Sequence, residues 1–141
     1  MILTYVDSGV LIYAAKGTDD AAALALPFLQ DQNRQFVTSD YVRLEVLPKS
    51  VFHGNVVETQ FYNGFFRINT RVIKTSDALL HLAMEEACRT GTSAMDAIHI
   101  ACAVFAGAEE LVTSERTSKP IHHTNLIKVV SIFPADAPPI S

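Results

Sequence analysis

Three carboxylates stand at points of the sequence where strands end or helices begin. Asp7 directly follows a β-branched and aromatic run at 2–6, and Glu115 follows the apolar stretch ELVTS at 110–114. Asp96 falls in the first turn of a helical pattern, SAMDAIHIACAV. In an open α/β sheet, strand carboxyl ends and the N-termini of the following helices meet at one edge. We therefore expect these three side chains to gather there.

A fourth acid, Glu45, is the only one within YVRLEVLP, where its apolar neighbours predict partial burial. A carboxylate in apolar surroundings is costly unless a cation or a hydrogen-bond donor compensates. Four acids drawn together repel, and each raises the pKa of its neighbours until a divalent ion neutralises them. Ligation by oxygen alone, with no organised cysteine or histidine cluster, favours Mg²⁺ or Mn²⁺ over zinc.

Each acid also has a structural interpretation, which for any one of them alone is the more common. These alternatives are a capping box of Ser93 with Asp96, an Asx turn at Asp7, and ion pairs of Glu45 with Arg43 or Lys49 and of Glu115 with Arg116. The joint pattern favours a site, because the structural interpretation requires four separate coincidences.

Histidines offer a second kind of ligand, and the alternatives stay open. His99 lies three residues after Asp96, and an acid-x-x-His pair on one helix face can bind metal. Only one such pair is present, so a hydrogen-bonded core histidine is the competing interpretation. His122 and His123 form a weak loop motif that suits phosphate contacts or plain solvation equally well.

Short apolar strands alternate with amphipathic helices along the chain. We expect strands at 2–6, 35–39, 71–74, 110–114 and 127–132. Helical periodicity and caps predict helices over 8–16, 19–32, 39–52, 56–68, 75–91 and 93–107. This alternation predicts a single-domain α/β fold of three layers, α/β/α, with a central, mainly parallel sheet of four to five strands.

Composition limits the classes of function. The 141 residues suit one domain over 1–133, with 134–141, PADAPPIS, as a loose tail. Fifteen acidic against eleven basic residues give a formal charge of -4, unlike a protein that coats duplex nucleic acid. Cys88 and Cys102 form no ligand motif and are expected to be reduced and buried. No signal peptide or membrane span is evident, so we expect a cytoplasmic protein.

Four segments together resemble a PIN-domain nuclease, the family that includes the VapC-type toxins of toxin–antitoxin pairs. They are YVDSGVLI at the start, LEVLPK, SAMDAIHIACAV and ELVTSE, and they order the chain to about residue 132. The resemblance implies a metal-dependent ribonuclease fold with a central parallel sheet and an acidic pocket.

The resemblance also assigns residues. Asp7, Glu45 and Asp96 match the acidic positions of the family, and Glu115 stands at the fourth, where most relatives carry aspartate. Small hydroxyl positions that orient carboxylates are matched by Ser8 and Thr113. The usual aromatic residue shortly after the fourth acid is replaced by polar residues, so the resemblance supports a first metal on Asp7 and Asp96 and leaves a second one open.

The sequence therefore predicts hydrolysis of RNA phosphodiester bonds with Mg²⁺ or Mn²⁺. The metal ligands would be Asp7, Asp96 and Glu115, with Glu45 binding the ion or orienting water. Candidates for contacting the substrate phosphate are Arg43, Arg116 and Lys119. The family also implies an antitoxin partner and a homodimer, for which the aromatic stretch QFYNGFF is a candidate interface, with core packing as an equal explanation.

Two other functions compete with this one. The first is a PIN-like protein that binds RNA or an antitoxin without cutting, which the altered fourth motif favours. The second is phosphotransfer on a similar sheet, against which DSGVL lacks the second aspartate of a D-x-D nucleophile motif.

Overall fold

The computed structural model describes residues 1–16, 19–69 and 71–135. Its strands are β1 (Ile2–Val6), β2 (Arg34–Ser39), β3 (Val72–Ile73), β4 (Glu110–Thr113) and β5 (Lys128–Ser131). Its helices are α1 (Ser8–Lys16), α2 (Asp19–Leu29), α3 (Asp40–Phe52), α4 (Val56–Ile68), α5 (Asp77–Thr90) and α6 (Ala94–Phe105), with a 3₁₀ turn, η1 (Pro120–His123). The predicted fold class is confirmed.

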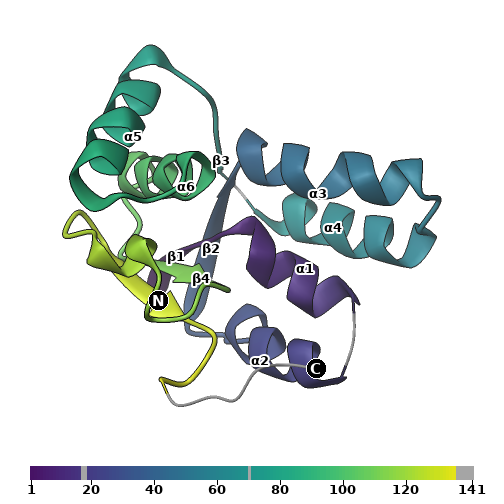
Figure 1. Ribbon diagram of the computed structural model, residues 1–141. Helices are drawn as coiled ribbons and strands as arrows, with labels where there is room; N and C mark the ends of the chain where they lie inside the picture. Colours follow the sequence, from purple (N-terminus) through teal and green to yellow (C-terminus); the bar gives the residue numbers. More distant parts are fainter. Residues whose placement is uncertain (17–18, 70, 136–141) are drawn as a thin grey trace.

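All five strands are parallel, in the order β3-β2-β1-β4-β5. From β1 the chain steps outward to β2 and β3, then returns across the sheet to β4 and β5. Right-handed crossovers in opposite directions place their helices on opposite faces. Accordingly, α1 to α4 lie on one side of the sheet and α5 and α6 on the other (Figure 1). The reversal of direction falls between β1 and β4.

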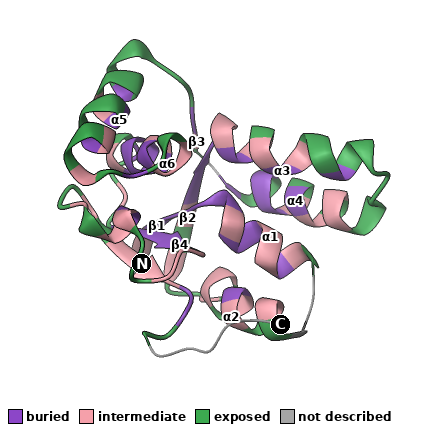
Figure 2. Cartoon of the chain, viewed as in Figure 1, coloured by how far each residue is buried: buried purple, intermediate pink, exposed green. Residues whose placement is uncertain are grey.

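The core follows from this layering, and Figure 2 shows its centre on the sheet and α6. Every residue of β4 is buried, and six of the twelve residues of α6 are buried. The aromatic stretch of α4 supplies Tyr62, Phe65 and Phe66 to the same core. Core packing therefore accounts for most of that stretch, which was one of its two predicted roles.

Side-chain caps fix where the helices begin. Ser39, Asn55, Ser76 and Ser93 each accept a hydrogen bond from the backbone N–H three residues later. α5 ends at Gly91, whose φ of 74° places it in the left-handed region that favours glycine. The Ser39 cap starts α3 directly after β2, at the carboxyl edge of the sheet.

Two predictions need correction or lie outside the structure. Cys88 is exposed, whereas Cys102 is buried as expected. In α5 the buried stripe runs through Leu79, Ala83 and Glu86, and Cys88, nine residues after Leu79, lies on the opposite side of the helix. Of the predicted tail, residues 136–141 lie outside the described residues.

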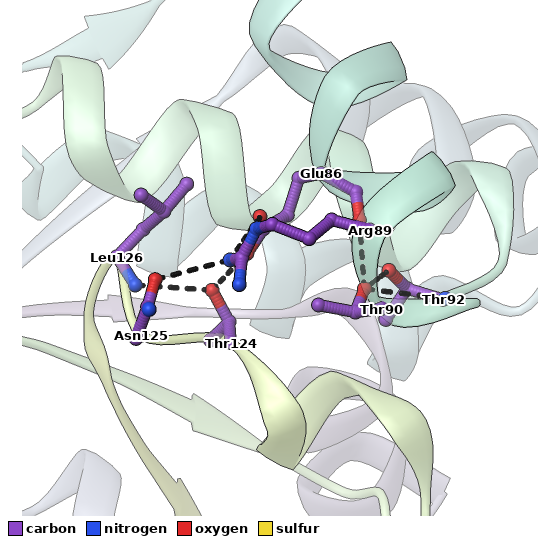
Figure 3. A network of polar contacts seen from close by, with 7 residues as sticks. All are labelled: Glu86, Arg89, Thr90, Thr92, Thr124, Asn125 and Leu126. Carbon is purple, nitrogen blue, oxygen red and sulfur yellow. Dashed lines mark hydrogen bonds and ion pairs between the residues drawn. The ribbon is translucent and has the colours of Figure 1, made fainter.

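A polar network around Glu86 holds the segment after η1 against α5 (Figure 3). The Glu86 side chain is buried and accepts hydrogen bonds from Arg89 Nε at 3.0 Å and from the Thr124 hydroxyl. Arg89 also donates to Asn125 Oδ1 at 3.0 Å, which fixes the turn that leads into β5. Because η1 lies just before this turn, the network also holds His122 in position.

Replacing Thr124 with valine removes the hydroxyl donor to Glu86 and leaves one buried carboxylate oxygen without it. We expect a loss of about 1 to 3 kcal/mol in the free energy of unfolding, measured by urea denaturation. The matched control is Thr117→Val at an exposed position, which should change stability by less than about 0.5 kcal/mol. Equal effects of the two replacements would contradict the role given to the network.

Candidate functional site

The reversal of strand order between β1 and β4 creates the crevice where ligands bind in open α/β sheets. Asp7 follows β1 directly, and its backbone N–H donates to Val112 O at 3.1 Å on β4. Thr113 ends β4, and its hydroxyl donates to Asp7 Oδ2 at 2.5 Å. The predicted positions of Asp7 and Thr113 therefore meet side by side at the crevice.

Asp7 is buried, with 4% of its surface exposed. Its Oδ1 accepts from Val10 N at 3.2 Å, which caps the first turn of α1. Burial raises the pKa of Asp7 above its ordinary value, and the charge of Asp96 raises it further, although His99 and the two hydrogen bonds act in the opposite direction. The carboxylate is held in place but remains unfavourable in its charged form.

Lack of a cationic partner distinguishes Asp7 from the other buried acids. Among the described residues, the acids that are almost fully buried are Asp7, Glu86 and Glu110. An ion pair joins Glu86 to Arg89 and another joins Glu110 to Arg34, whereas none joins Asp7 to a described lysine, arginine or histidine. A buried carboxylate without a cation is the kind of group that a metal ion stabilises.

Asp96 lies in the first turn of α6, where its backbone N–H donates to the Ser93 hydroxyl at 3.3 Å. The predicted cap is therefore present, and the Ser93 side chain also contacts the Asp96 carboxylate. Partial burial raises the pKa of Asp96, and the charge of Glu45 adds to this, whereas His99, the Ser93 contact and His122 lower it. The charge of Glu45 thus raises the pKa of Asp96, and the charge of Asp96 raises the pKa of Asp7.

A chain of hydrogen bonds fixes Glu45 from the interior. Ser39 Oγ lies 2.8 Å from the Tyr5 hydroxyl, which lies 2.8 Å from His99 Nδ1. His99 Nε2 lies 2.8 Å from Glu45 Oε1, and the Ser8 hydroxyl donates to the same oxygen at 2.5 Å. His99 therefore bridges Tyr5 and Glu45 through its two ring nitrogens.

This chain determines the charge of Glu45. Burial alone would raise the pKa of Glu45, but the hydrogen bonds from His99 and Ser8, with the charge of His99, lower it overall. Neighbouring acids are therefore tuned in opposite directions, since Asp7 and Asp96 have raised pKa values. Glu45 Oε2 makes no hydrogen bond with another described residue, and 32% of the Glu45 side-chain surface is exposed.

The other predicted residues lie farther from this group. Glu115 is half-buried, and its backbone N–H donates to Thr113 Oγ1 at 3.0 Å, which ties it to Asp7 through the threonine. Arg116 stacks over Phe133 at 4.1 Å, and Lys119 is exposed on the same loop. Arg43 points elsewhere, over the Phe66 ring at 5.1 Å, and pairs with Asp40 rather than with Glu45.

Oxygen donors and uncompensated burial at Asp7 and Asp96 fit a divalent cation of the Mg²⁺ or Mn²⁺ type. A preformed cage is not seen, because no three acidic, histidine or cysteine side chains converge as a metal site within 1–16, 19–69 and 71–135. The Thr113 hydroxyl occupies one lone pair of Asp7 Oδ2, and each Asp7 oxygen keeps another. The chemistry of the donors therefore fits such an ion with Asp7 and Asp96 as first ligands.

Sequence reasoning missed several supporting residues. Tyr5 and Ser39 connect to Glu45 only through the fold, and no spacing in the sequence indicates that connection. Gly9 gave a clearer signal, because it follows two matched positions in a helix where glycine is otherwise unfavourable. A Cβ on Gly9 would lie 1.9 Å from Ser114 Oγ, so only glycine lets α1 approach the end of β4 this closely.

Comparisons with known proteins agree with this geometry. The family model described as "PIN domain" matches residues 4–117. No curated protein matches the sequence.

Among solved structures, the chain is similar to a toxin–antitoxin complex from Klebsiella pneumoniae, with a TM-score of 0.67, 17% identity, and 92% of this chain and 98% of that one covered. It is also similar to VapBC2 from Rickettsia felis bound to a promoter DNA fragment, with a TM-score of 0.66, 16% identity, and coverage of 92% and 98%. DNA-bound VapBC from Salmonella typhimurium gives a TM-score of 0.66, 13% identity, and coverage of 94% and 100%. These likenesses support the fold.

Replacing Asp7 with asparagine should stabilise the protein at neutral pH. Since the folded-state pKa of Asp7 is raised above the ordinary value of 3.8, the folded protein binds more protons between those two values. Wild-type stability therefore falls as pH rises through this window and stays lower above it.

Asp7→Asn has no charge at this position, so its free energy of unfolding should exceed that of wild type at pH 7. The difference should shrink as the pH falls towards the ordinary aspartate pKa. Urea unfolding of both proteins from pH 4 to pH 7, without divalent ions, measures the difference, and Asp20→Asn at an exposed position is the control. An Asp7→Asn variant that is less stable than wild type at pH 7 would contradict the cost assigned to the buried charge.

Proposed function

Because the chain belongs to the PIN domain family, a family of nucleases, we propose that it is a divalent-metal-dependent endoribonuclease that hydrolyses RNA phosphodiester bonds. The single observation that carries the proposal is the buried Asp7 carboxylate, which has no cationic partner among the described residues. It lies at the sheet's switch point, with Asp96 and Glu45 acting along the same edge.

Asp7 and Asp96 would hold the ion, and Glu115 would complete its ligands from the β4 end. When bound, Mg²⁺ or Mn²⁺ would stabilise negative charge on phosphate oxygens and make water a better nucleophile. Thr113 and Val10 N–H keep the Asp7 carboxylate oriented before an ion arrives. This orientation reduces the rearrangement needed on binding.

Glu45 has a different task in the proposal. His99 and Ser8 both bind Oε1 and lower the pKa of Glu45, so the side chain is ionised at neutral pH and its Oε2 points away from these contacts. Glu45 would use Oε2 to orient the attacking water, or bind the ion as a further ligand. Ser8 and His99 would act only through Glu45.

Cations near the acids would position the substrate phosphate. Arg116 and Lys119 lie on the loop that directly follows Glu115 and are the first candidates. Arg43 would contribute only after leaving Asp40 and Phe66. The net charge of -4 makes this contact local rather than spread over the surface.

We also propose a protein partner. The similar structures are toxin–antitoxin complexes, two of them with DNA, so this chain would be the toxin of a type II pair with an antitoxin in the cytoplasm. An exposed apolar cluster at the turn between α3 and α4 is available for an antitoxin or a second copy of the chain; it comprises Val51, Phe52, Val56 and Val57. No described helix is long and apolar enough to cross a lipid bilayer.

The alternative is a protein of the same family that binds RNA or an antitoxin without cutting. Two observations favour it: the absence of a preformed three-ligand group among the described side chains, and a glutamate where most relatives carry aspartate. Metal-dependent cleavage by the purified protein separates this alternative from the nuclease.

Purified protein should cleave single-stranded RNA with Mg²⁺ or Mn²⁺ and stop when EDTA is added. Asp7→Asn should lower the cleavage rate by at least about 10²-fold, because it removes the charge that holds the ion. Asp20→Asn, the same replacement at an exposed position of α2, should keep nearly full activity. Full activity of Asp7→Asn, or cleavage that survives EDTA, would refute the assignment.

His99→Ala should lower kcat by about 10- to 100-fold with little change in KM, because Glu45 loses its fixed orientation. His99→Gln keeps an N–H donor towards Glu45 and should recover part of kcat. A purely structural role for His99 predicts a smaller folded fraction with unchanged kcat per folded molecule. Circular dichroism with active-site titration distinguishes these outcomes.

A further inference from the structure

Residues of α1, α3 and α4 line a groove of about 510 Å³. These helices lie on the sheet face opposite α5 and α6 (Figure 1). The volume of the groove lies within the range of pockets that bind small ligands such as nucleotides. The walls come from three helices, and the lining residues are Ile12, Lys16, Glu45, Val46, Lys49, Ser50, His53, Glu58 and Tyr62. The groove is therefore part of the folded domain rather than a loop feature.

The groove is continuous with the candidate site, because Glu45 lines one part of it. Lys49 follows Glu45 by four residues on the same face of α3, and His53, four residues further, is the C-cap of the helix. Each interval corresponds to about 6 Å along a helix, similar to one step between phosphates of an extended nucleic-acid strand. A strand whose phosphate lies at Glu45 would therefore meet these side chains next.

The groove contains two lysines and two acids, and its lysines are the groups that can bind an anionic ligand. Lys16 and Lys49 are exposed, and neither forms an ion pair with another residue that the structure describes. Both acids of the groove already have hydrogen-bond partners: Glu45 contacts His99 and Ser8, and the Glu58 carboxylate accepts from the side-chain amide of its helix cap, Asn55. The two lysines are thus the charged groups with unused binding capacity.

The remaining walls suit a nucleobase or a ribose. Ile12 of α1 is half-buried and provides apolar surface, whereas Val46 and Tyr62 line the groove from within the core. His53 is exposed at the end of α3, and its ring can stack on a base or form a hydrogen bond with it. Alternating phosphate and base contacts of this kind are typical of sites for single-stranded nucleic acid.

We propose that this groove binds the nucleotides of single-stranded RNA that flank the bond to be cut. Lys16 and Lys49 contact successive phosphates, and a base packs against Ile12 and the His53 ring. The inference rests on the proposed nuclease function and extends it from the reacting phosphate to the neighbouring part of the substrate. It assigns substrate binding to α1, α3 and α4, in addition to the loop after β4.

The test is the affinity for a short fluorescent single-stranded RNA, measured by anisotropy in EDTA so that no cleavage occurs. Lys16→Gln with Lys49→Gln should weaken binding by about tenfold. Loss of two phosphate contacts should also reduce the slope of log affinity against log salt by about 1.4, at about 0.7 per contact. The charge-matched control, Lys74→Gln with Lys128→Gln, alters exposed lysines outside the groove and should change affinity by less than about twofold.

Equal weakening in both double variants would overturn the inference, since it would indicate general attraction by surface charge. Poly-L-glutamate of the same charge, used as a second probe, should bind much more weakly than the RNA. Suppose that poly-L-glutamate bound as tightly as the RNA, and that Lys16→Gln with Lys49→Gln weakened both to the same extent. The groove would then accept an acidic peptide, and the RNA assignment would be wrong. A different result would count against the nuclease function itself: wild-type protein that binds RNA in EDTA but does not cleave it with Mg²⁺.

Discussion

The burial of one uncompensated negative charge, on Asp7, is the constraint on which the rest of the site depends. Such a charge is unfavourable in a folded protein unless hydrogen bonds or a cation offset its lost hydration. The protein supplies two hydrogen bonds, from Thr113 and Val10 N–H, and no ion pair from the described residues. Glu86 and Glu110 are equally buried, but each has an arginine. This contrast supports the proposal that Asp7 binds an ion from outside the protein.

The first strand organises the residues around this charge. Tyr5 faces the interior and reaches Glu45 through His99, while Asp7 lies at the strand's end and Ser8 begins α1. One short segment therefore connects α3 and α6 from opposite faces of the sheet. The arrangement separates two acidic functions: raised pKa values at Asp7 and Asp96, which an ion would relieve, and a lowered pKa at Glu45, which keeps it ionised.

The sequence predicted the layers and all five strands, because short apolar runs and amphipathic helices are local signals. Asp7 stands at a strand end and Asp96 in a first helical turn, as expected, and parallel topology brings such positions to one edge. The sequence could not predict the connection from Tyr5 to Glu45, which joins residues 40 apart through His99. Cys88 is exposed because it lies on the side of α5 that faces solvent. The apolar residues of the helix did not by themselves indicate which side that would be. The groove depends on the mutual packing of three helices, for which a single sequence carries no direct signal.

The central claim is that Asp7 and Asp96 bind one divalent cation together. Electron paramagnetic resonance of Mn²⁺ titrated into the protein tests it most directly, because bound and free Mn²⁺ give distinct signals without requiring cleavage. The account predicts one bound ion in wild-type protein, and loss of that binding in Asp7→Asn and in Asp96→Asn, each of which remains folded. Mn²⁺ binding with unchanged affinity in both variants would contradict it.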